Sequence, residues 1–472
     1  MILRLALRAL RARPARSAAL ACGFGLGVAV MASLLGIGEV MIEQARAPAL
    51  RGGGDVVIVG ATGQLTSARH VVSSVLQGAA FSARAVAASP SQRAAAYLVR
   101  GGRVVPIRAK GGVPSLERAL ADPETSSVAA WADTAADHEW VSPEPGAVLR
   151  AMDRFHPIPD VPARAASWAE WLYFNGRSGE SRFYLTFLVG SRRPNGRRTA
   201  GARLQLDHAG RRSSFSETIE LEEGPVLAEA PDLVIGASRV RLEGLRYHLT
   251  IDLPEERPAV HDRRAGGERA RGELFIDAAP GRSLPPFAIH GAGGWVSGYV
   301  VPVMNGALGG ALDVGSERLP FSGGSGYHDH NWGFWEGVTW QWGQVEHDGL
   351  SFVYGRVHPP ADAADPDRTP GFLAALGPEN PLGYSADVSI EETIDPASGR
   401  PRRILVKGRG PSLALTMVWD IEQVLVTRMP SAAFGSDMGF LQMRGQCRVT
   451  GQAGGHPVDF VAAGSSETFR GR

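Results

Sequence analysis

The densest run of chemistry-bearing side chains reads Tyr-His-Asp-His-Asn-Trp-Gly and is centred on Asp329. His328 and His330 flank this acid, and Tyr327 and Asn331 stand one position further out. In an extended segment successive side chains point to opposite faces, so the two histidines share one face and Asp329 takes the other. A carboxyl group in an apolar setting keeps its proton at neutral pH, because desolvation disfavours its charged form. Asp329 is therefore a candidate proton donor to an alkene, with His328 or His330 orienting it or accepting the proton of a captured water.

Tryptophan gathers around the same run. Four of the ten tryptophans are Trp332, Trp335, Trp340 and Trp342. At strand spacing Trp340 and Trp342 face the same side. An aromatic face stabilises a nearby cation by about 0.5–2 kcal/mol, so these rings are candidates for the wall around a carbocation. Core packing is the commoner role for such rings, and the interior of a small barrel can combine both roles.

Two segments far away in sequence carry related side chains. An aromatic segment runs from Trp168 to Gly176, and a late segment reads Gly-Ser-Ser-Glu and ends at Glu467. Together with the central run they supply the predicted site. The predicted catalytic residues are Asp329, His328 and His330, and the predicted ligand-binding residues are Trp171, Tyr173, Asn175, Tyr327, Asn331, Trp332, Trp335, Trp340, Trp342 and Glu467.

Three interpretations of the central run stay open at the level of sequence: a buried hydrogen-bond network that braces the fold, a proton-transfer site, and a metal site. A metal site needs a third ligand beside His328 and His330, and the candidates are His347 and Glu336. Their spacing is not typical of any metal motif, so we predict neither a metal nor a cofactor.

Composition and missing motifs exclude several other classes. Lys and Arg number 49 against 48 Asp and Glu, so the net charge of +1 creates no field that would recruit nucleic acid. Cys22 and Cys447 are too few for a disulfide framework or a thiolate zinc site. The chain contains no G-x-S-x-G elbow, no Walker lysine loop, no H-E-x-x-H and no C-x-x-C, which disfavours serine hydrolases, NTPases and zinc proteases.

The elements that must position these residues are strands. Apolar residues alternate with polar ones from Leu245 to Leu253, which is the period of a half-buried strand, and similar short segments recur along residues 168–472. Asp348-Gly349 is a strong hairpin turn signal. The 59 glycines and 32 prolines also favour short strands and turns. Over about 300 residues this pattern predicts two β-barrel units rather than one.

The two aromatic segments and the late Gly-x-x-Glu together resemble the lipocalin-like AttH family, which includes carotenoid 1,2-hydratases of the CrtC type. The matching segments are Glu170–Gly176, Tyr327–Gly333 and Gly464–Glu467. The resemblance implies two packed lipocalin-like barrels and a hydrophobic, isoprenoid-like ligand, without a cofactor. This chain differs in having Leu172 where a second tryptophan is frequent, and in its N-terminal segment.

That N-terminal segment predicts a membrane anchor. Residues 1–16 carry five arginines and no acid, and Ser17–Gly38 contains no charge. Twenty-two helical residues span about 33 Å, enough for the hydrocarbon core, whereas a cleaved signal peptide has a shorter apolar stretch. The arginines stay cytoplasmic by the positive-inside rule. The pattern, continuing into Gly54–Gly60, is similar to the first transmembrane helix of FtsX-type ABC transporter permeases.

The predicted fold is therefore mainly β: two lipocalin-like antiparallel barrels preceded by a single transmembrane helix and a small α+β spacer. The expected segments are 1–41 (anchor), 42–167 (spacer), 168–315 (first barrel) and 316–472 (second barrel). We expect an inner-membrane, single-pass protein with a periplasmic body that acts on an isoprenoid-like ligand by hydrating or cyclising an alkene. The alternative is a non-enzymatic carrier of a hydrophobic compound that works with ABC transporter subunits.

Overall fold

The computed structural model describes most of the chain beyond residue 86. The described residues are 14–15, 24, 26, 28, 30–31, 56–59, 65, 67–77, 87–101, 103–120, 130–256, 268–279, 282–364, 370–378, 381–428 and 438–471. The chain divides into two compact units: residues 1–65 with 87–137, and residues 66–86 with 138–472. Most of the predicted anchor, Ser17–Gly38, lies outside the described residues. Among the described residues, no helix combines the length and hydrophobicity needed to cross a membrane.

The first unit contains a two-stranded hairpin and a short helix. Strands β1 (Ser91–Arg100) and β2 (Arg103–Gly112) pair antiparallel, and helix α5 (Pro114–Ala119) follows them. Lys110 and Ser89 contact the buried carboxylate of Glu117 at 2.9 and 2.7 Å. The predicted spacer, residues 42–167, contains these elements but extends into the second unit.

The second unit begins with helices α3 (Ala68–Gln77), α6 (His138–Val141) and α7 (Pro145–Met152). The Glu144 side chain accepts hydrogen bonds from the backbone N–H groups of Gly146 and Ala147, which caps α7 at its start. Helix α7 packs against β8 and β12 of the first barrel, and Asp153 follows directly after it. Asp153 is thereby carried into the first barrel, although the sequence analysis placed it in the spacer.

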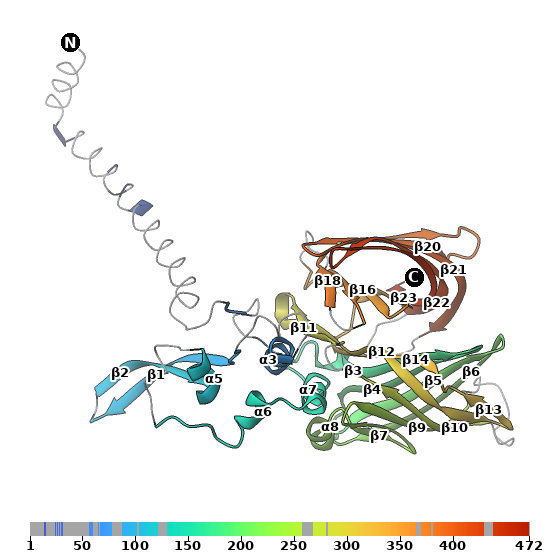
Figure 1. Cartoon of the computed structure of the whole chain (residues 1–472), viewed down its shortest axis with the longest axis horizontal. Helices are drawn as coiled ribbons and strands as arrows, with labels where there is room; N and C mark the ends of the chain where they lie inside the picture. The colour runs from blue at the N-terminus through green and yellow to red at the C-terminus, as the bar shows by residue number, and fades with distance from the viewer. Residues whose placement is uncertain are drawn as a thin grey trace, which may run out of the picture. The chain divides into compact units, whose positions relative to one another are not determined.

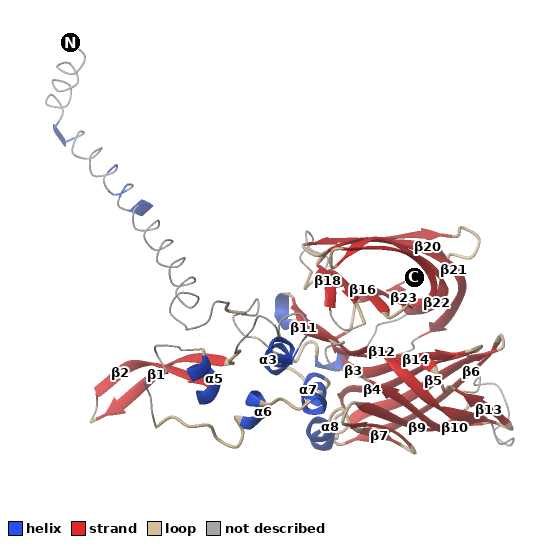
Figure 2. Cartoon of the chain, in the orientation of Figure 1, coloured by secondary structure: helices blue, strands red, loops and turns tan. Residues whose placement is uncertain are grey.

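The first barrel is a twelve-stranded antiparallel sheet, shown in Figures 1 and 2. Its main path runs β6-β5-β4-β3-β14-β12-β10-β9-β8-β7, and β11 and β13 pair with β12. An isolated bridge between Phe215 and Glu255 brings β6 close to the end of β9 and nearly closes the barrel. The strands are β3 (Trp168–Ser178), β4 (Ser181–Arg192), β5 (Arg198–His208), β6 (Arg211–Leu221), β7 (Leu233–Ile235), β8 (Ser238–Glu243), β9 (Arg246–Pro254), β10 (Arg269–Asp277), β11 (Leu284–His290), β12 (Val296–Val314), β13 (Glu317–Pro320) and β14 (Gly324–Phe334). Helix α8 (Glu223–Glu229) lies between β6 and β7.

The second barrel is a nine-stranded antiparallel sheet in the order β18-β17-β16-β15-β23-β22-β21-β20-β19. The predicted hairpin turn joins β15 to β16, with positive φ at Asp348 and Gly349. Two mainly β, nearly closed barrels are therefore confirmed. The strands are β15 (Thr339–His347), β16 (Leu350–His358), β17 (Gly371–Leu376), β18 (Pro381–Ser385), β19 (Asp387–Ile394), β20 (Pro401–Gly410), β21 (Leu413–Arg428), β22 (Met438–Ala453) and β23 (His456–Gly471).

One predicted boundary needs correction. The expected border between the barrels at residue 316 would put the central motif in the second barrel. Strand β14, which carries that motif, is instead hydrogen-bonded between β3 and β12 in the first sheet. Strand β15, five residues after β14, begins the second sheet. The motif therefore lies at the junction of the barrels, but on the first one.

Close packing around the motif depends on a glycine in β12. Gly298 pairs with Trp332 of β14, and the indole ring lies directly over it. A Cβ at Gly298 would come within 1.9 Å of Trp332 Cε2, closer than any side chain permits. The ring keeps its place because position 298 has no side chain.

Candidate functional site

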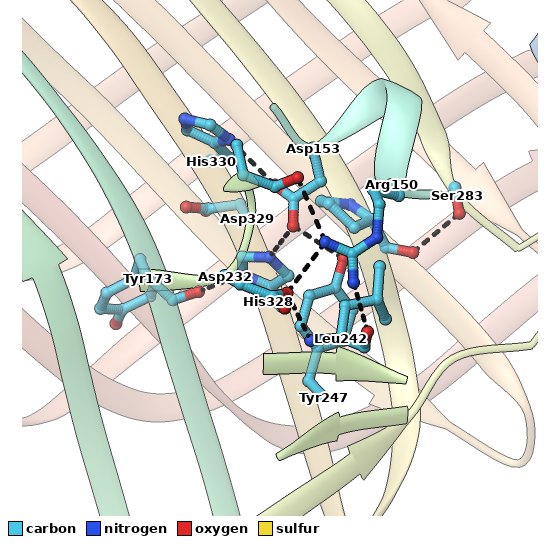
Figure 3. A network of polar contacts seen from close by, with 12 residues as sticks. Arg150, Asp153, Tyr173, Asp232, Leu242, Tyr247, Ser283, His328, Asp329 and His330 are labelled. Atoms are coloured by element: carbon cyan, nitrogen blue, oxygen red, sulfur yellow. Dashed lines mark hydrogen bonds and ion pairs between the residues drawn. The ribbon is translucent and has the colours of Figure 1, made fainter. Parts of the chain in front are cut away.

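Strand β14 divides the central motif between two environments. Tyr327, Asp329 and Asn331 point toward the second barrel, whereas His328 and His330 point into the core of the first. Figure 3 shows that the contacts of both histidines run to Asp153 and that the Asp329 side chain points away from it. The prediction that His328 or His330 orients Asp329 is therefore wrong, because the pleat of the strand separates them.

The carboxyl group of Asp329 sits in a shell of neutral donors. The hydroxyls of Tyr299 and Tyr327 donate to its Oδ2 at 3.2 and 3.0 Å, and Asn331 Nδ2 donates to its Oδ1 at 2.8 Å. The side chain is 3% exposed. Burial raises the pKa of Asp329 well above its usual range, and the nearby Glu467 raises it further, while the tyrosine hydrogen bonds oppose the shift. These surroundings favour the protonated carboxylic acid over the carboxylate.

A second carboxyl group reaches this place from the other barrel. Glu467 on β23 accepts a 2.8 Å hydrogen bond from the Tyr173 hydroxyl and a 3.4 Å bond from Gln442 Nε2. Burial raises the pKa of Glu467 to about 7, against the effect of these two donors. Asp329 and Glu467 are therefore two buried acids of raised pKa, one from each barrel.

The aromatic surroundings of Asp329 are packed. Trp342 Nε1 donates to the Tyr299 hydroxyl at 2.9 Å, and the indole ring lies 5.4 Å from the ring of Tyr327. Trp342 is 5% exposed and belongs to an apolar core that joins the two barrels. The residues of this core include Tyr173, Leu284, Tyr299, Val301, Met304, Tyr327, Trp342, Val353, Phe372, Ala374 and Leu376.

Two of the other predicted tryptophans, Trp171 and Trp340, pack against the edge of the same apolar core. Trp340 stacks on Phe469 at 4.2 Å, and Trp171 packs against Trp335 at 4.6 Å. Trp332 faces away from Asp329 and stacks on His156 at 4.1 Å. Only Trp342 among the tryptophans of this motif hydrogen-bonds to the shell of Asp329.

The histidine face forms a separate buried network, drawn in Figure 3. Asp153 accepts from His328 Nε2 and His330 Nδ1 at 2.9 Å each, and from the Tyr247 hydroxyl at 2.7 Å. Burial alone would raise the pKa of Asp153, but the charges and hydrogen bonds of the two histidines hold it far below its usual value. His328 Nδ1 also bonds to the carbonyl of Tyr173 at 3.0 Å. This network fixes β14 from behind.

The same network continues to Glu170. Its Oε1 lies 2.9 Å from His330 Nε2 and 2.7 Å from His156 Nδ1. Burial opposes a charge on His330, yet its bonds to Asp153 and Glu170 raise its pKa to about 9. His330 is therefore an imidazolium held between two carboxylates.

Three of these side chains have the composition of a metal site. Ligand-type atoms of His156, Glu170 and His330 lie within 4.8 Å of one another. The contacts to Glu170 Oε1 are hydrogen-bond lengths, shorter than the roughly 3.3 Å between ligands around tetrahedral zinc with bonds of about 2.0–2.1 Å. The group fits an ion-pair network better than a metal. The third ligands considered from sequence, His347 and Glu336, join no such cluster among the described residues.

Asn175 lies at a cleft between the barrels, beside the Asp329 shell. Its Oδ1 accepts a 3.2 Å hydrogen bond from Gln344 Nε2. We call this hollow the inter-barrel cleft; its volume for water-sized spheres is about 20 Å³, room for about one water. It is lined by Asn175, Gly176, Arg177, Arg182, Ser325, Tyr327, Gln344, Val345, Glu346, Ala463, Gly464 and Ser465.

Sequence reasoning missed several residues at these two networks, among them Asp153, Tyr247 and Tyr299. Tyr299 lies in a long β12 strand whose polar alternation is weak, and Tyr247 appeared only as an apolar position of an alternating strand. Asp153 follows a short helix in a proline-rich segment, and nothing around it signals burial. Its partners His328 and His330 are 175 and 177 residues away. No local pattern connects them.

Comparisons with known proteins give structural likeness without close relatives. No family model matches the sequence, and no curated protein matches it significantly. Similar solved structures include CghA in complex with Sch210972, at 12% identity and a TM-score of 0.44, covering 64% of this chain and 88% of CghA.

Two other solved structures are similar at comparable levels. A candidate AttH from Nitrosomonas europaea shares 16% identity at a TM-score of 0.41, over 64% of this chain and 92% of that protein. Kievitone hydratase from Nectria haematococca shares 13% identity at a TM-score of 0.39, over 66% of this chain and 93% of that protein. TM-scores below 0.5 establish no common site or activity.

Proposed function

We propose that this chain is an enzyme that protonates an alkene of an isoprenoid-like ligand at the contact between its barrels, and that water capture or ring closure completes the reaction. The observation that carries the proposal is Asp329. It is a buried acid whose pKa is raised, surrounded by neutral donors and aromatic rings and separated from the histidines. An alkene is a weak base, so its protonation needs an acid that has kept its proton at neutral pH.

In the first step the O–H bond of Asp329 breaks and the π electrons of the alkene form a C–H bond. A carbocation remains on the other alkene carbon, and a carboxylate remains on Asp329. The Tyr299, Tyr327 and Asn331 donors stabilise that carboxylate. The ring of Trp342 faces the same core and contributes about 0.5–2 kcal/mol to a nearby cation.

In the second step the cation is quenched. For hydration, a water oxygen bonds to the cationic carbon and its proton returns to the carboxylate of Asp329, directly or through Glu467. For cyclisation, a second alkene attacks and an adjacent carbon loses the proton to the same acceptor. Glu467 suits this transfer because its pKa of about 7 lets it hold or release a proton near neutral pH.

Access requires the barrel faces to part, because Asp329 is 3% exposed and the inter-barrel cleft admits about one water. The histidines take no part in either step. Their bonds to Asp153 hold β14 in register behind the acid, which is a positioning role.

The test is turnover of a panel of prenyl compounds in D₂O, from squalene to prenyl carboxylates and phosphates, followed by mass spectrometry. Hydration adds the mass of D₂O, with one deuterium on carbon, and cyclisation exchanges one hydrogen for deuterium. Both products should disappear in Asp329→Asn. Recovery of unlabelled polyene from wild-type protein and variant alike, across a panel of prenyl compounds, would contradict the enzymatic proposal and favour the carrier.

The carrier alternative predicts a different result from purification. A carrier that works with an ABC exporter should co-purify with one lipid of a single mass, whereas the enzyme should co-purify with a mixture of alkene and product. The same preparation tests the proposed location: full-length protein should fractionate with inner membranes and expose residues after 41 to periplasmic protease. Protein that lacks residues 1–40 would mean a cleaved signal.

A further inference from the structure

The inter-barrel cleft differs from the apolar core beside it, because most of its lining side chains are polar. It contains two guanidinium groups, Arg177 and Arg182, and two amides, Asn175 and Gln344. Strands β3, β4 and β14 of the first barrel and β15 and β23 of the second supply its walls. Both barrels therefore build it.

Asn175 has an unused donor in this cleft. The side chain is 5% exposed, and its Oδ1 accepts from Gln344 Nε2, which fixes the orientation of the amide. Its Nδ2 is buried and has no hydrogen-bond partner among the described residues. A buried N–H without an acceptor is disfavoured, so this geometry indicates a missing acceptor.

Arg182 supplies an unbalanced positive charge. Its Nη1 donates to Ser465 Oγ at 3.1 Å and to the Tyr184 hydroxyl at 3.4 Å, both neutral. None of the ion pairs among the described residues includes Arg182. Its neighbour Arg177, by contrast, is paired with Glu346 at 3.1 Å. Within the described part of the chain, the Arg182 guanidinium therefore lacks a carboxylate partner, and Asn175 Nδ2 lacks an acceptor. An anionic oxygen complements both groups.

The cleft is connected to the reactive acid by one side chain. Tyr327 lines the cleft and donates its hydroxyl hydrogen bond to Asp329 Oδ2 at 3.0 Å. Once the barrel faces part, a ligand whose polar end lies in the cleft would extend past Tyr327 toward the apolar core.

We propose that the inter-barrel cleft binds the anionic oxygen group, a carboxylate or a phosphate, of the ligand whose alkene meets Asp329. Arg182 and Asn175 Nδ2 bind that group, and the substrate class is an anionic isoprenoid-like amphiphile rather than a hydrocarbon. This inference rests on the proposed function and specifies its substrate.

The test compares two probes with one polyene tail, retinoic acid and retinol. Full-length protein in lipid nanodiscs is titrated with each, and tryptophan emission reports binding, because Trp342 lies against Tyr327. Wild-type protein should bind retinoic acid roughly 10- to 100-fold more tightly than Arg182→Gln does, the range for a charged hydrogen bond. Retinol should bind both proteins equally. Each probe also partitions into the nanodisc lipid, but this partition is the same for wild type and variant, so it cancels when their affinities are compared.

Control variants test whether weaker binding comes from the loss of Arg182 itself or from the loss of any positive charge. Arg318→Gln removes an exposed arginine from the far hairpin of the first barrel and should leave both affinities unchanged. Asn175→Asp places a negative charge at the free donor and should weaken retinoic acid alone. Far-ultraviolet circular dichroism and melting temperature confirm that each variant is folded.

The outcomes distinguish the inference from the function on which it rests. Equal affinity of wild type and Arg182→Gln for retinoic acid, with retinol still bound, overturns the head-group site and leaves the ligand proposal standing. Binding of neither probe overturns both. Inorganic phosphate is the third probe. If phosphate raises the melting temperature of wild-type protein but not of Arg182→Gln, and wild-type protein does not bind retinoic acid more tightly than the variant does, the cleft binds a free anion. That result would overturn the proposal of an amphiphile.

Discussion

The hydroxyl of Tyr173 on the first barrel donates a 2.8 Å hydrogen bond to Glu467 on the second. These residues are 294 positions apart, and both are buried. Asp329 lies near enough that the charge of Glu467 raises its pKa. The candidate site is therefore a property of the barrel pair and is absent from either barrel alone.

Asp329→Asn should give an inactive but stable enzyme. The amide fills nearly the same volume and carries no charge, like the protonated acid that burial of Asp329 favours, so the melting temperature should change little. Loss of the proton donor should lower turnover by roughly 10²- to 10⁴-fold. A structural brace would show the reverse, an unstable variant whose folded fraction remains active. Melting temperature and turnover measured on one preparation decide between them.

Glu467→Gln should remove part of the pH dependence of stability. The folded pKa of Glu467 is raised from 4.5 to about 7, so the native state holds the proton more tightly than the unfolded chain. The contribution of Glu467 to the free energy of unfolding is therefore fully present below pH 4.5. It is lost as the pH rises through about 7, a change on the order of 3 kcal/mol. Urea unfolding at pH 5 and pH 8 should show a smaller difference for Glu467→Gln than for wild type. Glu391→Gln, at an exposed position of β19, should show the wild-type difference.

Asp153→Ala should destabilise the first barrel strongly. The substitution leaves the imidazolium of His330 with Glu170 as its one remaining carboxylate and removes the partner of His328. Breaking a buried pair by removing one member costs about 3–5 kcal/mol. Asp313→Ala breaks the exposed pair with Arg318 and should cost below about 1 kcal/mol. Similar unfolding free energies for the two variants would show that the histidine network contributes no more than a surface contact.

Local pattern predicted the strands and the division of the motif between two faces. Alternation placed Asp329 opposite His328 and His330, and the Asp348-Gly349 turn set the hairpin that begins the second barrel. These features depend on residues within a few positions of one another. The inference that the histidines assist Asp329 contradicted that alternation, and the structure corrects it.

Long-range pairing could not be predicted in the same way. Strand β14 belongs to the first barrel because it pairs with β3, some 150 residues earlier in the chain, at registers such as Asp329 with Tyr173. Hydrophobic alternation carries no information on which strand is the neighbour. The contacts of Tyr299, Asp153 and Arg182 join segments that are distant in the sequence, so they appear only in the folded chain.

Trp342→Phe distinguishes a ligand wall from a contact between barrels. The indole Nε1 donates to the Tyr299 hydroxyl, which in turn donates to Asp329, so phenylalanine keeps an aromatic ring but removes the first bond of this chain. Stability should fall by about 0.5–1.5 kcal/mol and turnover should fall with it. Trp342→Ala should cost about 3–5 kcal/mol because the ring fills the core between the barrels. Trp340→Phe is the control, since its ring stacks on Phe469 and has no hydrogen bond to the shell of Asp329 among the described residues, so its replacement should keep turnover. A Trp342→Ala variant with wild-type unfolding free energy and weakened ligand binding would identify the ring as ligand wall instead.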